Sequence, residues 1–121
     1  MINGYFGSEG ELFFEIDLIA ADGSIITVDA LLDTGFTDWL AMNIQDAESL
    51  NWSFEGEREM KTARGTANFN LYRGSISFEG EPLNIPVLVG EDISEILIGL
   101  PWLERWRLVV DKPANLLTLG S

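Results

Sequence analysis

Ala30-Leu31-Leu32-Asp33-Thr34-Gly35-Phe36-Thr37 is the most informative stretch of this sequence. Its first residues end an apolar run, Ile25 to Leu32, that has the composition of a buried strand. The run leads directly into Asp33-Thr34-Gly35, so this triplet is expected at a tight glycine turn immediately after the strand. An ordinary turn, in which aspartate caps its own backbone, has the same residues. The triplet alone therefore does not separate a structural turn from a chemical site.

The rest of the chain predicts a β-rich domain with two short helices. An Asp-Gly turn at Ala21-Asp22-Gly23-Ser24 predicts that the segment from Glu11 to Leu32 forms two paired strands. Further strands are predicted at Gly74 to Phe78, Pro82 to Val89, Arg107 to Val110 and Leu116 to Leu119. The helices are predicted at Ile44 to Leu50, capped by Asn43, and from Pro101 onward. About eight short strands in all favour a compact barrel or sandwich formed by one domain, residues 1–121.

A projecting hairpin is predicted in the middle of the chain. Two alternating runs, Glu59 to Ala63 and Ala67 to Tyr72, flank Arg64-Gly65-Thr66. Glycine permits the tight turn that such a hairpin needs at its tip. Many of the neighbouring residues are polar or charged, which is typical of a hairpin that extends into solvent.

The charge of the chain excludes two classes of partner. Its 121 residues include 20 acidic and 7 basic side chains, which gives a net charge of −13. Such a charge repels the phosphates of nucleic acids and the anionic head groups of membranes, so neither is expected as a partner. The sequence opens with no basic segment before an apolar run, and no stretch reaches membrane-spanning length. We therefore expect a soluble, cytoplasmic protein.

The composition also restricts the chemistry. The chain has no cysteine, which excludes disulfides, thiolate catalysis and cysteine-ligated zinc. It has no histidine, which excludes the Ser/His and Cys/His pairs and removes the most common general base. An enzyme made from this chain must therefore use carboxylates. Two close carboxylates that share one proton can activate a water molecule, one acting as general base and the other as acid.

Three features of the sequence resemble the retropepsin-like aspartic proteases. Two apolar residues followed by Asp33-Thr34-Gly35 are similar to the active-site signature of this family. Ile96-Leu97-Ile98-Gly99, followed by a short helix, is similar to the element that lies beneath the catalytic loop in the family. The hairpin from Lys61 to Phe69 stands where the family has its substrate-covering flap. The resemblance covers nearly the whole chain and fits the bacterial branch of the family.

This resemblance implies an all-β fold, a small closed barrel of the retropepsin or pepsin-lobe type with one or two short helices, acting as a homodimer. It implies that Asp33 is the catalytic aspartate, that Thr34 bonds across the dimer axis and that Gly35 allows close backbone approach. Ile98 and Gly99 would support the active-site loop. The implied substrate-binding residues of the flap are Ala63, Arg64, Gly65 and Thr66.

The chain has one Asp-Thr-Gly triplet, so the second aspartate of a catalytic pair must come from another copy. The expected partners are therefore a second subunit and a peptide or protein substrate, and neither a cofactor nor a metal is expected. The implied activity is hydrolysis of peptide bonds by an aspartic-type endopeptidase.

Two positions depart from the retroviral pattern and leave an alternative open. Phe36 stands where retroviral members have a small residue, although bacterial relatives tolerate an aromatic one, and Leu100 replaces an arginine that braces their subunits. Asp38 then either lacks its partner or pairs with Arg105 or Arg107. These departures are also compatible with a non-catalytic binding module of the same fold.

The last predicted strand, Leu116 to Leu119, has two interpretations. It is either an edge strand within one chain or part of the sheet that joins two subunits, as the resemblance implies.

Overall fold

The computed structural model describes residues 1–62 and 65–121, and most of them lie in strands. The strands are β1 Ile2–Phe6, β2 Leu12–Ile19, β3 Ile25–Leu32, β4 Leu40–Asn43, β5 Ser53–Thr62, β6 Gly65–Phe78, β7 Glu81–Gly90, β8 Ile96–Ile98, β9 Arg107–Asp111 and β10 Leu116–Gly120. The helices are α1 Ile44–Ser49 and α2 Pro101–Arg105. The predicted all-β class with two short helices is confirmed.

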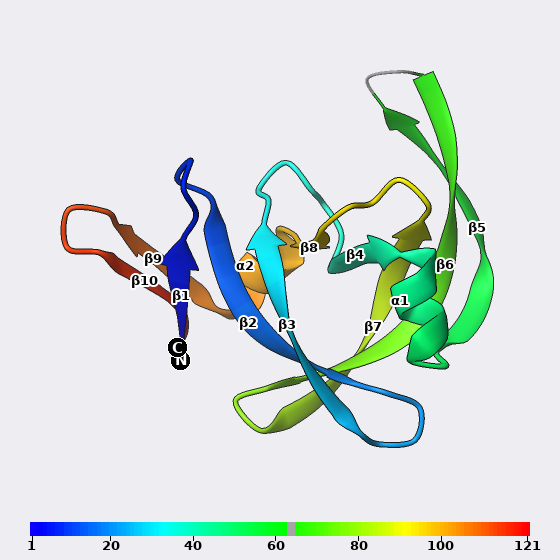
Figure 1. Cartoon of the computed structure of the whole chain (residues 1–121), viewed down its shortest axis with the longest axis horizontal. Helices are drawn as coiled ribbons and strands as arrows, with labels where there is room; N and C mark the ends of the chain where they lie inside the picture. The colour runs from blue at the N-terminus through cyan, green and yellow to red at the C-terminus, as the bar shows by residue number, and fades with distance from the viewer. Residues whose placement is uncertain (63–64) are drawn as a thin grey trace.

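Six of the strands close into a barrel. The ten-stranded sheet runs in the order β5-β6-β7-β4-β8-β3-β2-β1-β10-β9, and an additional pairing of β6 with β2 closes the ring from β2 to β6. Most neighbours are antiparallel, whereas β3 with β8 and β4 with β7 are parallel. In Figure 1 the hairpin of β5 and β6 rises on one side of this barrel, and the hairpin of β9 and β10 extends on the other.

The barrel forms because strand residues alternate between its interior and solvent. In β2, Phe14, Ile16 and Leu18 are buried, whereas the side chain of Glu15 is exposed. This alternation is the period-two pattern of a half-buried strand. Trp102 of α2 has no exposed surface and packs against the rings of Phe78, Trp39 and Trp106, so the helix closes one end of the core.

Local signals set the turns and helix ends as predicted. The side chain of Asn43 accepts a hydrogen bond of 2.8 Å from the backbone N–H of Asp46, which caps α1. Pro101 occupies the first turn of α2, where no backbone N–H is needed. Gly23 has a φ of +88° in the turn between β2 and β3, a conformation that favours glycine. Among the described residues, neither helix is long and apolar enough to cross a membrane.

The terminal strands lie side by side and correct one interpretation. The first residues of β1 pair with β10, and its last residues pair with β2. Strand β10 therefore lies between β1 and β9 of the same chain, and its residues from Leu117 to Gly120 are buried (Figure 1). The interpretation of Leu116 to Leu119 as an edge strand is therefore wrong. The interpretation as part of a sheet that joins two subunits concerns a second copy of the chain and stays a prediction. Strand β9 occupies the edge instead.

Candidate active site

Two loops and one hairpin lie at the same end of the barrel (Figure 1). The loop between β3 and β4 carries Asp33, Thr34 and Gly35, and the loop between β7 and β8 lies beside it. The hairpin of β5 and β6 projects at the same end. The structure thus places the Asp-Thr-Gly triplet and the predicted flap at a common end, although they are distant in sequence.

Asp33 is held by its backbone while its side chain stays accessible. Its N–H donates to the carbonyl of Ile98 at 3.0 Å, and its own carbonyl accepts from the N–H of Phe36 at 3.0 Å. One side-chain oxygen, Oδ1, accepts a hydrogen bond of 2.9 Å from the N–H of Gly35. The triplet is exposed in the single chain. The carboxylate is therefore oriented by the turn and free to meet another group on its open side.

Strand β8 supports this turn from below. Leu32, the last residue of β3, pairs with Ile98 in parallel register, and Ile98 is fully buried. The next residue, Gly99, is buried against the loop, and a Cβ there would collide with the carbonyl oxygens of Phe36 and Asp38. The N–H of Leu100 also donates to the Phe36 carbonyl at 3.0 Å. Glycine is thus required at position 99 by the close approach of two backbone segments.

The predicted flap is a long two-stranded hairpin. Strands β5 and β6 pair from Ser53 with Arg73 to Thr62 with Gly65, and a bulge interrupts the register between Phe54 and Gly56. Of the four predicted flap residues, Gly65 and Thr66 begin β6 and are exposed. The other two, Ala63 and Arg64, lie outside the described residues.

Asp38 has a partner that the sequence analysis missed. Its Oδ1 lies 3.0 Å from Nη1 of Arg58, a residue of β5. The predicted pairing with Arg105 or Arg107 is wrong, because Arg105 lies over the ring of Trp106 and Arg107 is exposed in β9. No local signal in the sequence marks Arg58, since the two partners are 20 residues apart.

A groove runs beside the hairpin. Its volume is about 540 Å³, and it is bordered by Ile44, by residues 66–70 of β6 and by residues 89–92 at the end of β7. Asp33 does not line this groove in the single chain. In the part of the chain that the structure describes, no group of three or more acidic side chains is arranged to hold a metal ion.

Comparison with solved structures identifies the fold. No protein-family model and no curated protein sequence matches the chain. A retropepsin-like aspartic protease from Rickettsia conorii matches with a TM-score of 0.64 and 22% identity, over 99% of this chain and 92% of that one. The EIAV protease in complex with an inhibitor matches with a TM-score of 0.57 and 18% identity, over 74% of this chain and 84% of that one. The protease of Simian Foamy Virus (mac) matches with a TM-score of 0.50 and 18% identity, over 74% of this chain and 94% of that one.

The chain therefore has the retropepsin-like fold. This confirms the fold that the Asp-Thr-Gly triplet and the Gly99 element predicted, and a bacterial protein is among the similar structures.

Proposed function

We propose that this chain is an aspartic endopeptidase that hydrolyses peptide bonds as a homodimer. The observation that carries the proposal is the placement of an accessible Asp33 carboxylate on a turn fixed to β8 by the close approach at Gly99. The hydrogen bond from the N–H of Gly35 to the Asp33 side chain is also typical of an ordinary aspartate turn. An ordinary turn, however, needs no second segment of the chain packed beneath it. The retropepsin-like fold supports the same function.

In the proposed mechanism two Asp33 carboxyl groups, one from each subunit, share one proton and hold a water molecule between them. The ionised carboxylate takes a proton from the water as its oxygen attacks the carbonyl carbon of the substrate. The protonated carboxyl gives its proton to the carbonyl oxygen, which forms a tetrahedral intermediate. Breakdown of this intermediate breaks the C–N bond: the leaving nitrogen takes a proton from one carboxyl group, and a hydroxyl of the intermediate returns a proton to the other carboxylate. The products are a carboxylic acid and an amine, and the pair again shares one proton.

The hairpin of β5 and β6 would hold the substrate over this pair. An extended peptide can bond to backbone groups of a strand, with its side chains directed alternately to either face. The groove beside β6 is bordered by apolar side chains of Ile44, Phe69 and Val89. We therefore propose that the substrate is an extended segment with apolar side chains, clasped under the hairpin.

A subunit-mixing experiment tests whether the site is shared. When active protein is mixed with a growing excess of Asp33→Asn subunits, its peptide cleavage is expected to fall toward zero, because mixed dimers have only one carboxylate of the pair. Fluorogenic peptide cleavage, measured after subunit exchange, gives the rate. Excess protein carrying Asp29→Asn, a change at an exposed aspartate of β3, is the control and should leave the rate unchanged. A rate that does not respond to Asp33→Asn subunits would mean that each chain acts alone.

The pH dependence tests the shared proton. Cleavage is expected to fall on the alkaline side as the pair loses its proton, because the acid that protonates the carbonyl oxygen is then missing. The measurement is kcat/KM as a function of pH, with circular dichroism at each pH to confirm that the protein stays folded. A rate that stays constant well into alkaline pH would contradict the mechanism.

A further inference from the structure

The hairpin of β5 and β6 needs something to fix its position. In the part of the chain that the structure describes, β5 is the terminal strand of the sheet and pairs only with β6. From Asn70 to Phe78 strand β6 also pairs with β7, and in its outer part the neighbouring strand among the described residues is β5. A two-stranded hairpin is marginally stable by itself, so its orientation depends on contacts made outside its own ladder.

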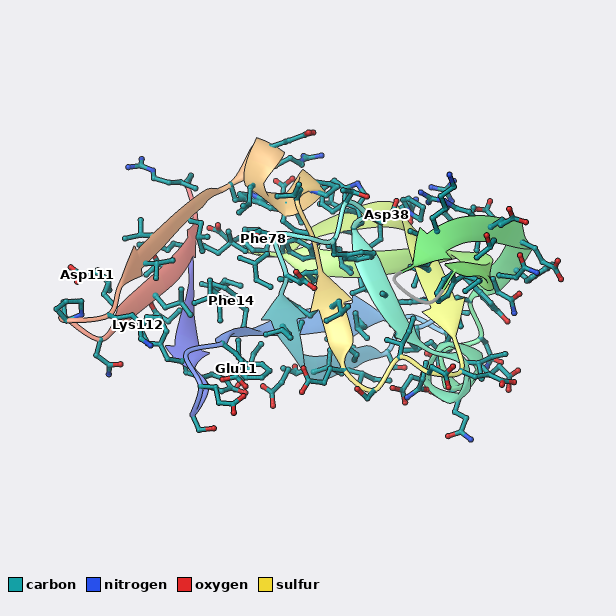
Figure 2. All side chains as sticks on the ribbon, turned by 90° about the horizontal axis from the view of Figure 1, so that it is seen from above. Glu11, Phe14, Asp38, Phe78, Asp111 and Lys112 are labelled. Atoms are coloured by element: carbon teal, nitrogen blue, oxygen red, sulfur yellow. The ribbon has the colours of Figure 1, made fainter. Side chains whose placement is uncertain are left out.

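The ion pair between Arg58 and Asp38 is such a contact. Arg58 lies in the middle of β5, and Asp38 lies in the loop between β3 and β4, five residues after Asp33. Figure 2 shows Asp38 next to the hairpin strands. The pair therefore joins the arm of the hairpin directly to the loop that carries the proposed catalytic residue.

The Asp38 end of this pair is rigidly placed. Its backbone carbonyl is one of the two oxygens packed against Gly99, so its position is set by β8. Its side chain is only 18% exposed, compared with 41% for Arg58. A charged group that is mostly withdrawn from water gains more from a partner than a fully exposed one.

The second oxygen of Asp38 increases this dependence on Arg58. Oδ2 is buried and has no hydrogen-bond partner among the described residues. The hydrogen bond that Arg58 donates to Oδ1 is the polar contact described for the Asp38 carboxylate, so it offsets the free-energy cost of withdrawing this carboxylate from water. Any opening of the hairpin that draws Arg58 away leaves this carboxylate uncompensated, so the pair opposes opening.

A second ion pair of the hairpin cannot have this role. Nε of Arg73 in β6 lies 3.3 Å from Oε1 of Glu55 in β5. Arg73 lies where β6 pairs with both β5 and β7, so this contact joins two neighbouring strands at the base of the hairpin and does not reach the Asp33 loop. This pair provides a matched control with the same kind of charges in the same hairpin.

We propose that Arg58 and Asp38 are positioning residues that fasten the hairpin to the Asp33 loop and set its position relative to Asp33. The catalytic part of this inference rests on the proposed endopeptidase function, whereas the fastening itself does not. Because substrate and transition state lie under the same hairpin, losing the pair weakens the binding of both. This raises KM and leaves kcat nearly unchanged.

The kinetic experiment compares Arg58→Gln with Arg73→Gln. We expect Arg58→Gln to raise KM about three- to ten-fold and to change kcat by less than about two-fold. We expect Arg73→Gln to change both KM and kcat by less than about two-fold. Arg58→Lys keeps the charge and should restore most of the wild-type KM. In the double variant Arg58→Gln/Asp38→Asn, the loss of Asp38 should add little to the effect of Arg58→Gln, because the two residues act as one unit. Equal KM values for wild type, Arg58→Gln and Arg73→Gln would overturn the catalytic part.

A spin-label experiment tests the fastening without any substrate. The chain has no cysteine, so Glu59→Cys, at an exposed position in β5, creates a single attachment site for a nitroxide. We expect the spectrum of the label to show faster motion in the Arg58→Gln background than in the wild-type or Arg73→Gln backgrounds. Unchanged motion in the Arg58→Gln background would overturn the proposal.

The two experiments separate failure of this inference from failure of the proposed function. A chain that cleaves no peptide but shows the faster label motion would refute the endopeptidase and support the fastening. Faster motion together with an unchanged KM would show that the hairpin does not position substrate, which overturns the assignment of Arg58 and Asp38 as positioning residues.

Discussion

Replacing Asp33 by Asn is expected to abolish peptide cleavage, with a loss at least on the order of 10³-fold in kcat/KM. Asparagine has nearly the same shape, and its side-chain oxygen can still accept the hydrogen bond from the N–H of Gly35. It cannot be ionised or donate an acidic proton, so the pair loses both its general base and its shared proton. The measurement is cleavage of a fluorogenic peptide by purified variant protein, with circular dichroism to verify the fold.

Asp29→Asn is the matched control for this experiment. Asp29 lies in β3, four residues before Asp33, and is exposed, so its replacement makes the same change in charge outside the turn. We expect this variant to retain its activity. Cleavage that survives Asp33→Asn, or that is lost equally in both variants, would contradict the catalytic role of Asp33.

Replacing Trp102 by Ala is expected to cost about 3–5 kcal/mol of unfolding free energy. Trp102 is fully buried between the rings of Phe78, Trp39 and Trp106, at centroid distances of 5.9, 5.8 and 5.3 Å. Its Nε1–H also donates a hydrogen bond of 2.7 Å to the carbonyl of Trp39. The substitution therefore creates a cavity and leaves a carbonyl without its donor. Urea denaturation followed by circular dichroism gives the free energy.

Trp106→Ala provides the comparison for this prediction. Trp106 ends the same helix and has the same size, but it is only partly buried. Its loss should therefore destabilise the protein clearly less than the loss of Trp102. An equal or larger effect of Trp106→Ala would mean that burial in the core is not what makes Trp102 important.

The strands and turns that depend on neighbouring residues were predictable from the sequence. Alternating apolar residues located β2, Asp22-Gly23 located the turn after it, and Asn43 located the start of α1. Two strands had no such signal. Strand β4 consists of the residues Leu40 to Asn43, too few to show a period. Strand β1 contains Gly4, a residue type that is uncommon in strands and so does not indicate one. Glycine is needed at this position because a Cβ there would collide with β2 and β10.

The candidate site was predictable in part. The resemblance indicated that Gly99 lies under the Asp33 turn, and a local reading of the residues gives no reason for that contact. Arg58 was missed because its contact with Asp38 depends on how a long hairpin is oriented relative to the barrel. The assigned roles of Thr34 and of the hairpin tip remain predictions, since Thr34 would act on a second subunit and Ala63 and Arg64 lie outside the described residues.

The closure of the barrel has a consequence for how the chain reaches its native state. The ring is completed by pairing Asp17 with Ser77 and Leu18 with Ile76, segments about sixty residues apart in sequence. Sheets with such distant partners fold slowly, and their strand edges are unpaired in the meantime. During that interval the edges of β2 and β6 can recruit other chains into aggregates. The net charge of −13 makes incompletely folded copies repel one another, so the acidic composition protects the protein at its most vulnerable stage.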